Sequence, residues 1–585
     1  MKPVLLTIVA LSCSISLQAQ NTAKKDSLLN REMTLEKEYS PTVRDAVKIS
    51  QLPELREPQA PKTTVEFSNY ANPLEIQPKL FPLSPQAYFT NMNYSKYKGY
   101  LTGGISSLID INGDLGYQIL NSNQDRLNIF FSHRSSGCNI SYLQDEFYDD
   151  DTRKFKINDN WGGLNYMHDF DWIKLYADAK YTYSAFNYYG YTIGIVGAQP
   201  FIDKNTNQVN NMFEMNLGVA SDKANELNYK ANLHYTSFGQ KYGNTIDEKG
   251  SKENRILIDG DVHKLINSAM GIGASGLIKT FSYGNNEFKS LNESATNYWS
   301  YSLNPYLYWE YANLNLLLGA KMDVEVGGRN KIIFSPAVRF NYYPSDQVML
   351  YILADGGIKN NSQYNMYYEN RYVDPFIRVF DSRSPLDVTA GVKFTPISTL
   401  SAGIFGGYKI TKDEHFFYSD GSVKGTPMLA GNWITPSYED ANTVKFGADI
   451  KYAYQDIFEF GLKGTYYQWT ISKDKDPLDM IPHGIWNKPA FEMNMNAEYN
   501  LQWLPLRFDL SYSGVYGRKA AYNNFITDSY KMKDIHDLSV KGTYSITPYF
   551  SVYASLNNLL FSKYDLWWGY PAQGFNIIGG LSVLF

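Results

Sequence analysis

The sequence contains few cysteines and no long apolar run. Only two of its 585 residues are cysteines, Cys13 and Cys138. Cys13 falls in an N-terminal export segment described below, so the mature chain keeps a single cysteine and can form no internal disulfide. Beyond that segment, no run of 18 apolar residues occurs, which excludes a transmembrane helix. The fold must therefore be held by hydrogen bonding and packing.

An excess of charge of one sign is also lacking. The chain has 54 basic and 59 acidic residues and a net charge of −5. Proteins that bind nucleic acid need a clustered basic surface, so this balance argues against a nucleic-acid partner. Aromatic residues are abundant in contrast: they make up 16% of the chain and include 49 tyrosines, more than a soluble core requires.

The first 20 residues have the features of a cleavable signal peptide. Lys2 precedes the apolar stretch Val4–Leu11, and small residues close the segment. We therefore expect residues 1–20 to be removed on export. The alternative, a lipoprotein signal modified at Cys13, is disfavoured because Ala10 stands where such signals usually carry leucine.

Alternation of apolar and polar residues is the main structural signal in the rest of the chain. In Phe491–Gln502 every odd residue is apolar or aromatic and every even residue is polar or charged. Successive side chains of a strand point to opposite faces, so this segment has one apolar and one wet face. The same pattern occurs in the segments Leu506–Tyr516, Ile173–Tyr183, Phe213–Val219, Leu227–Tyr235, Val338–Tyr342, Phe446–Tyr454, Phe458–Tyr466 and Leu538–Ile546. Runs near ten residues suit tilted membrane strands of about 9–11 residues, whereas strands of soluble proteins are typically about 5–6 residues long.

Short turns alternate with long polar loops along the chain. The short links are Asn121–Asp125, Asp169–Trp172, Ser221–Asn225, Tyr311–Asn313, Pro344–Gln347 and Thr547–Tyr549. The long loops are Gln144–Asp159, Tyr189–Val209, Asn360–Ser384, Asp413–Glu439 and Ser472–Lys488. Outer-membrane barrels place short turns in the periplasm and long loops outside. We predict an all-β fold, a transmembrane antiparallel β-barrel of the outer-membrane type over residues 96–585, with roughly 22 strands within a range of 18–22.

Aromatic clusters and the C-terminus fit the same architecture. We predict that several aromatic clusters lie in the girdles at the two membrane interfaces. These clusters are Tyr188-Tyr189, Tyr306–Trp309, Tyr342-Tyr343, Tyr466–Trp469 and Trp567-Trp568. The loop tyrosines Tyr364, Tyr367, Tyr368 and Tyr372 fit either a girdle or a ligand-stacking role. The final strand carries Phe575, Ile577, Leu581, Val583 and Phe585 on one face, the pattern of a barrel-assembly signal read by the insertion machinery.

Residues 21–95 differ in kind from the barrel region. They contain eight prolines and no sustained period, which indicates an extended lead on the periplasmic side. Three interpretations of this segment are open: it is a free tether, a partial plug in the lumen, or a segment that binds a partner in extended form. Its many apolar and aromatic residues favour docking.

The signal peptide, the segment Glu38-Tyr39-Ser40-Pro41-Thr42-Val43, the proline-rich lead and the tyrosine-rich barrel together resemble TonB-dependent-receptor-like outer-membrane proteins. The resemblance implies uptake of a large or scarce nutrient through a 22-stranded barrel. It also implies contacts with outer-membrane lipids and with TonB or another periplasmic or outer-membrane protein. Glu38, Tyr39, Pro41 and Val43 are the candidate partner-binding residues of the lead, and Met33-Thr34-Leu35-Glu36 resembles a TonB-contacting peptide. The sequence departs from this family because a complete plug domain is longer than residues 21–95.

No catalytic, cofactor or metal site is predicted. Gly271–Gly276 matches the dinucleotide fingerprint but lies in an alternating strand with no helix after it. The seven histidines show no metal-ligand spacing, and the acidic group Glu146, Asp149, Asp150 and Asp151 lacks the pattern of an EF-hand. Lys445, Asp449, Lys451 and Lys463 are expected on the wet face, where they could tune solute selectivity. We expect no enzymatic activity. Transport is the favoured function, and a structural or assembly component of an outer-membrane complex is the alternative.

Overall fold

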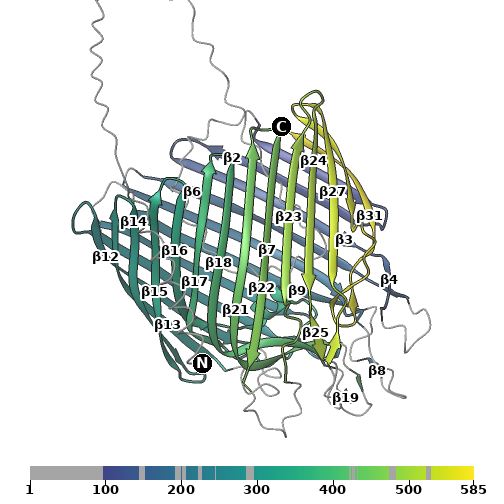
Figure 1. Ribbon diagram of the computed structural model, residues 1–585. Coiled ribbons are helices and arrows are strands. Elements are labelled where there is room, and N and C mark those ends of the chain that lie inside the picture. The colour runs from purple at the N-terminus through teal and green to yellow at the C-terminus, as the bar shows by residue number, and fades with distance from the viewer. Residues whose placement is uncertain are drawn as a thin grey trace, which may run out of the picture. The chain divides into compact units, whose positions relative to one another are not determined.

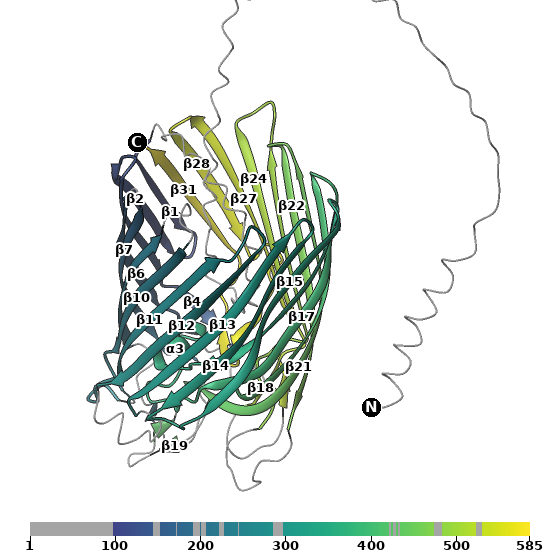
Figure 2. The same cartoon turned by 90° about the vertical axis from the view of Figure 1, so that its left-hand side faces the viewer.

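The computed structural model describes residues 97–143, 152–170, 172–190, 199–200, 206–221, 227–243, 245–284, 296–420, 423–424, 429–430, 433–472, 483–521 and 529–585. Within these residues, 22 strands form one antiparallel sheet that closes on itself as a barrel (Figures 1 and 2). The predicted fold class and strand number are therefore confirmed. The predicted signal peptide, the lead with Glu38, Tyr39, Pro41 and Val43, and the acidic group at 146–151 lie outside the described residues.

Each barrel strand pairs with its neighbours along the chain, and the last strand pairs with the first. The strands are β1 (Gly99–Ser106), β2 (Ile111–Asn121), β3 (Asp125–Ser136), β6 (Ile157–Asp169), β7 (Ile173–Asn187), β9 (Asn207–Ser221), β10 (Leu227–Gln240), β11 (Lys252–Leu265), β12 (Met270–Tyr283), β13 (Tyr298–Tyr311), β14 (Leu314–Val326), β15 (Ile332–Ser345), β16 (Val348–Lys359), β17 (Ser382–Ile397), β18 (Leu400–Asp420), β21 (Trp433–Tyr454), β22 (Phe458–Ile471), β23 (Phe491–Asn500), β24 (Leu506–Tyr516), β27 (Ile535–Thr547), β28 (Phe550–Asn557) and β31 (Asn576–Leu584). The pairing of β1 with β31 closes the 22-stranded sheet, so that none of its described strands forms an open edge.

Smaller elements belong to the long connections. They are β4 (Asn139–Ser141), β5 (Thr152–Lys154), β8 (Gln199–Pro200), α3 (Gln363–Glu369), β19 (Val423–Lys424), β20 (Leu429–Ala430), β25 (Lys519–Ala521), β26 (Ser529–Lys531), β29 (Asp565–Trp567) and β30 (Tyr570–Pro571). No helix among the described residues is long and apolar enough to cross a membrane.

Short and long connections lie at opposite ends of the barrel. The end with the short turns also carries the C-terminus, at the top of Figures 1 and 2, and β19 marks the long-loop end at the bottom. The predicted short links all fall between paired strands. The predicted loop Asp413–Glu439 is wrong, because β18 and β21 stay paired from Glu414↔Glu439 to Asp420↔Trp433. The ladder is shifted between Thr411 and Glu414, and this irregularity interrupts the alternation that marks a strand in the sequence.

The two faces of the wall differ as the alternation predicts. On β13, Leu303 and Leu307 are each 50% exposed on the outer face, while Asn304 and Tyr306 line the lumen. An outer surface of exposed leucine, isoleucine and aromatic side chains suits the hydrocarbon of a bilayer.

Tyrosine rings pack over glycines on the lumen wall. Gly271 and Gly273 belong to strand β12, so the resemblance of this segment to a dinucleotide fingerprint has no helix to support it. A Cβ atom at Gly271 would lie 2.2 Å from the ring of Tyr308, and one at Gly273 would lie 2.4 Å from the ring of Tyr306. A side chain at either glycine would therefore have to displace the neighbouring tyrosine ring.

Candidate functional site in the barrel lumen

The connection between β16 and β17, residues 360–381, folds into the barrel; we call it the crossing loop. Its helix α3 starts after Ser362, whose side chain accepts a hydrogen bond from the backbone N–H of Asn365. Such an N-cap satisfies a backbone donor that the helix leaves free. Four residues of this short helix are buried: Gln363, Tyr364, Met366 and Tyr367. The loop is therefore part of the core, near the long-loop end of the barrel (Figure 2).

The crossing loop is fastened to strands β6, β7 and β9. The hydroxyl of Tyr364 donates to Glu214 Oε1 of β9 over 2.5 Å. The hydroxyl of Tyr367 contacts Ser184 Oγ of β7 at 2.7 Å. After the helix, the guanidinium of Arg371 donates to Asp159 Oδ2 of β6 over 2.9 Å. These three strands are remote from β16 and β17 in the sheet order, so the loop reaches across the lumen.

Other contacts hold the loop to the remaining wall. Glu369 Oε2 lies 2.7 Å from His415 Nε2 of β18, and Glu369 Oε1 lies 3.5 Å from Lys488 Nζ in the β22–β23 connection. The backbone N–H of Asp374 donates to the carbonyl of Ile434 in β21 over 3.0 Å. The crossing loop is thus held by strands on several sides of the barrel.

Aromatic side chains fill the space around the crossing loop. The rings of Tyr372 and Tyr570 stack with centroids 4.1 Å apart, and Tyr189 packs edge-on against both. The hydroxyl of Tyr188 donates to the carbonyl of Val373 over 3.1 Å. This core joins loops from four parts of the chain and occupies the lumen at the long-loop end. Its buried members are Cys138, Ile140, Phe155, Ile157, Phe186, Tyr188, Tyr189, Met212, Phe238, Phe281, Tyr283, Tyr298, Tyr364, Met366, Tyr367, Tyr372, Val373, Phe376, Ile377, Val379, Phe417, Trp433, Ile434, Trp567 and Tyr570.

The girdle prediction is wrong for two of the aromatic pairs. Tyr188-Tyr189 and Trp567-Trp568 are buried among loops and do not face lipid. Within strands the clusters divide between the two faces: Tyr466 is 48% exposed, whereas Tyr467 is buried. Adjacent residues of a strand point to opposite sides, so only one of two neighbouring aromatic residues can lie in a girdle.

The charge of Glu369 in the crossing loop is compensated by nearby cations. Although burial alone raises the pKa of Glu369, the nearby His415, Lys488 and Lys359 hold it well below its ordinary value. Burial raises the pKa of Tyr367 and of Tyr372 to about 12. The carboxylate is therefore ionised at neutral pH, and both phenols keep their protons and can act as hydrogen-bond donors.

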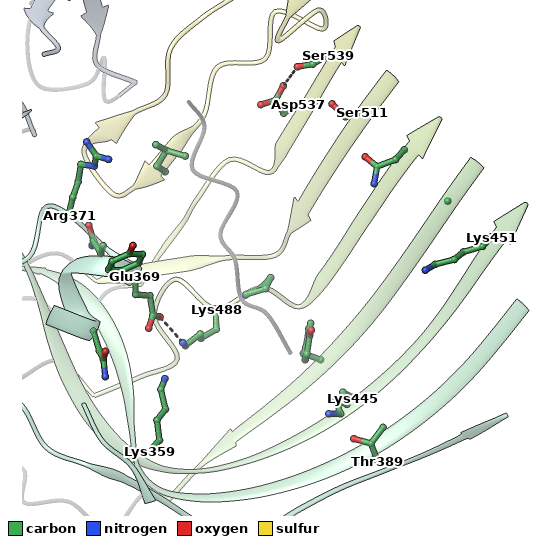
Figure 3. Close-up of a pocket in the computed structure, with 18 of the residues that line it drawn as sticks. Lys359, Glu369, Arg371, Thr389, Lys445, Lys451, Lys488, Ser511, Asp537 and Ser539 are labelled. Atoms are coloured by element: carbon green, nitrogen blue, oxygen red, sulfur yellow. Dashed lines mark hydrogen bonds and ion pairs between the residues drawn. The ribbon is translucent and has the colours of Figure 1, made fainter. Parts of the chain in front are cut away.

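A cavity of 2430 Å³ occupies the lumen beside the crossing loop. Its lining extends from Glu369 and Arg371 on the crossing loop to Thr399 and Arg507 at the short-turn end. Figure 3 shows Lys445 and Lys451 on the strands that line this space. Lysines, arginines and carboxylates are interspersed over the wall, so the cavity offers a hydrated, charged surface to a solute.

The predicted lumen charges lie where the alternation places them. Lys445 and Lys451 line the cavity. Asp449 pairs in register with Lys463 of the neighbouring strand β22. Opposite charges directly across a ladder stabilise the sheet modestly, by about 0.2–1 kcal/mol.

The residues of the predicted assembly signal lie at the seam of the barrel. Ile577, Leu581 and Phe585 are exposed on the outer face, and Val583 pairs with Leu101 of β1. Phe575 precedes β31 and stacks on Phe561 with centroids 4.7 Å apart. The backbone carbonyl of Phe585 accepts hydrogen bonds from the N–H groups of Lys98 and Gly99, at 2.7 and 2.8 Å. Recognition of these residues by the insertion machinery remains a prediction.

The role of the crossing loop was missed by sequence reasoning, which left its tyrosines undecided. Tyr364, Tyr367 and Tyr372 are core residues, and Tyr368 is 52% exposed. One signal was available: Ser362 is a good N-cap residue, and Tyr364 and Tyr367 stand three residues apart, on one face of a helix. Among the residues that the structure describes, no group of three or more His, Cys, Asp or Glu side chains could hold a metal ion.

Comparison with known proteins shows that this chain is similar to solved structures in its fold. No protein-family model matches the sequence, and no curated protein sequence matches it. Among solved structures, a variant of the ferric enterobactin receptor PfeA from Pseudomonas aeruginosa has a TM-score of 0.61 and 11% identity, over 84% of this chain and 82% of that one. The siderophore receptor PirA from Acinetobacter baumannii has a TM-score of 0.60 and 12% identity, over 84% and 80%. The copper transporter OprC has a TM-score of 0.58 and 12% identity, over 83% and 80%. The chain thus has the barrel fold of these receptors and transporters.

Proposed function

We propose that this protein is an outer-membrane transporter of the TonB-dependent-receptor-like type, which takes up a solute through its lumen. One observation carries the proposal: a wide barrel encloses a charged cavity of 2430 Å³ beside a loop that crosses the lumen. A barrel that served only as a scaffold would have no use for a hydrated interior with a closure at one end. The similar structures, which are described as receptors and transporters, support transport over the structural alternative.

The remaining parts of the chain complete the proposal. The signal peptide at residues 1–20 directs export, and residues 21–95 act on the periplasmic side as a partial plug or as the segment that contacts TonB. The short-turn end, where β1 begins, then faces the periplasm, and the crossing loop lies toward the outside. In this arrangement the crossing loop is the outer closure of the pathway.

Conductance in planar lipid bilayers tests the proposal. The purified protein would be compared with a variant lacking residues 21–90, with a variant whose residues 363–378 are replaced by glycine and serine, and with one carrying both changes. We expect the intact protein to be closed and the doubly changed protein to conduct ions steadily. The matched control replaces residues 472–487, an equal length of the connection between β22 and β23, and keeps Lys488, which pairs with Glu369 of the crossing loop. Closed channels in all four proteins would contradict a solute pathway through the lumen.

A further inference from the structure

Four polar side chains on the outer face of β3 and β6 are linked by a continuous series of hydrogen bonds. Ser135 Oγ lies 3.0 Å from His133 Nε2. His133 Nδ1 lies 2.8 Å from Asn160 Oδ1, and Asn160 Nδ2 donates to Asn158 Oδ1 over 2.7 Å. A hydroxyl, an imidazole and a carbonyl oxygen that orients the imidazole are the three parts of a serine hydrolase site, which is recognised by geometry and roles and not by sequence order.

The hydrogen bonds determine which nitrogen of His133 carries the proton. Because the Asn160 amide nitrogen donates to Asn158, its oxygen faces His133, and an amide oxygen can only accept. Nδ1 of neutral His133 must then be the protonated nitrogen. Nε2 is left as the acceptor for the hydroxyl of Ser135. This is the tautomer that a general base needs in order to take a proton from serine.

The backbone register explains why these residues meet. His133 and Ser135 are two residues apart on β3, so both side chains point to the same face. His133 stands directly opposite Asn160, and Ser135 stands directly opposite Asn158 in the ladder with β6. The arrangement is thus fixed by a regular part of the barrel wall, which holds side chains more rigidly than a surface loop does.

This group faces lipid near the level of the headgroups. On the same face of β3, Phe131 is 47% exposed and Ile129 is 39% exposed. Ser135 is one residue from the end of β3 at the long-loop end, where outer-membrane barrels meet the outer interface. On the other side of His133, Gly113 of β2 stands opposite it, and a Cβ atom at Gly113 would have no neighbour within 4 Å. The space beside the imidazole is open to a membrane lipid.

We propose that Ser135, His133 and Asn160 form a hydrolase site for the ester-linked acyl chains of membrane lipids. Ser135 Oγ attacks the ester carbonyl carbon while its proton passes to His133 Nε2. The carbon–oxygen bond to the lipid alcohol breaks, and that oxygen takes the proton from His133. Water then attacks the acyl-serine, giving up a proton through His133, which releases the fatty acid and restores Ser135. This activity goes beyond the proposed transport and does not use the lumen.

Covalent labelling and lipid hydrolysis test the proposal in the full-length protein. The probes are a fluorophosphonate, which modifies activated serines, and phosphatidylethanolamine in mixed detergent micelles. We expect an adduct on Ser135 and release of fatty acid, both lost in Ser135→Ala, with a fall in rate of about a thousand-fold or more. Ser132→Ala is the matched control, because Ser132 belongs to the same strand and to the lumen-facing row. Its ladder partner on β6 is Trp161, which lines the cavity.

Asn160 is a positioning residue, and its role needs a separate readout. We expect Asn160→Ala to lower the rate at least ten-fold and Asn160→Asp to restore most of it, because a carboxylate oxygen can also accept the hydrogen on Nδ1. The heat-dependent gel mobility of the folded barrel verifies that each variant is folded. Fatty-acid release by Ser135→Ala equal to that of the unchanged protein, or no adduct on Ser135 in folded protein, would overturn the proposal.

Discussion

Arg371 of the crossing loop and Asp159 of β6 form an ion pair over 2.9 Å, although 212 positions separate them in the chain. Both side chains are largely buried, and the guanidinium of Arg371 also lies over the ring of Phe186, 5.9 Å from its centroid. The ion pair fastens the crossing loop, which connects β16 and β17, to strand β6 on another side of the lumen.

Arg371→Ala is expected to release the crossing loop. Asp159 would keep a buried charge without its partner, which costs about 3–5 kcal/mol for such pairs. We expect more frequent conducting openings in planar bilayers, measured in protein that lacks residues 21–90. The control is Lys412→Ala, which breaks the exposed pair with Asp440, an interaction worth about 0–1 kcal/mol. Equal opening frequencies in the two variants would argue against Arg371 as a fastening of the loop.

The packing of the crossing loop should weaken as the pH rises. Burial, together with the negative charge of Glu325, raises the pKa of Asp381 to about 7, against an ordinary value of about 4. Between these values the packed loop keeps the proton on Asp381 while the released loop loses it, so packing is favoured less as the pH rises from about 4 to 7. We expect more openings at pH 8 than at pH 5.

The variant Asp381→Asn checks this assignment. Its amide stays neutral at both pH values, so the difference in opening frequency between pH 5 and pH 8 should shrink or vanish. Asp440→Asn, a change at an exposed carboxylate, should leave the pH response as it is. If Asp381→Asn responds to pH as strongly as the unchanged protein does, another group governs the response.

Lys451 should influence which ions pass through the opened lumen. It lines the cavity near the short-turn end and is exposed to it. In the protein with a replaced crossing loop and no residues 21–90, Lys451→Glu should shift selectivity toward cations, because a negative wall attracts them. The reversal potential under a potassium chloride gradient measures this. The control is Phe446→Leu, a change on the outer face, which should leave the reversal potential unchanged. An unchanged reversal potential in Lys451→Glu would show that ions do not pass this part of the lumen.

Phe585→Ala tests the predicted assembly signal. The ring of Phe585 stacks on Tyr117 with centroids 6.0 Å apart, while its backbone bonds to Lys98 and Gly99 do not need the ring. We expect the variant to form the barrel more slowly in cells but to reach the same folded state. The measurement is the time course of heat-modifiable protein. The control is Leu560→Ala, an exposed residue of a long loop; if both variants assemble at one rate, Phe585 is only a lipid-facing side chain.

Much of the barrel was predictable from local pattern. The alternation in Phe491–Gln502 is that of β23, and short links such as Tyr311–Asn313 join paired strands. Where the ladder is irregular, at Thr411–Glu414, the alternation breaks, and the sequence pattern predicts a loop where the two strands in fact stay paired. Prediction was therefore good where structure depends on neighbouring residues and poor where a bulge disturbs the period.

The fold class, the two faces of the wall and the lumen position of Lys445 and Lys451 could be predicted from the sequence alone. These follow from the two-residue period of strands, which is a local property. The contacts of Arg371 with Asp159 and of His133 with Asn160 are seen only in the folded chain. Such contacts depend on ladder register and on how a long loop packs, and both are fixed by residues far apart in the chain that compete for the same space.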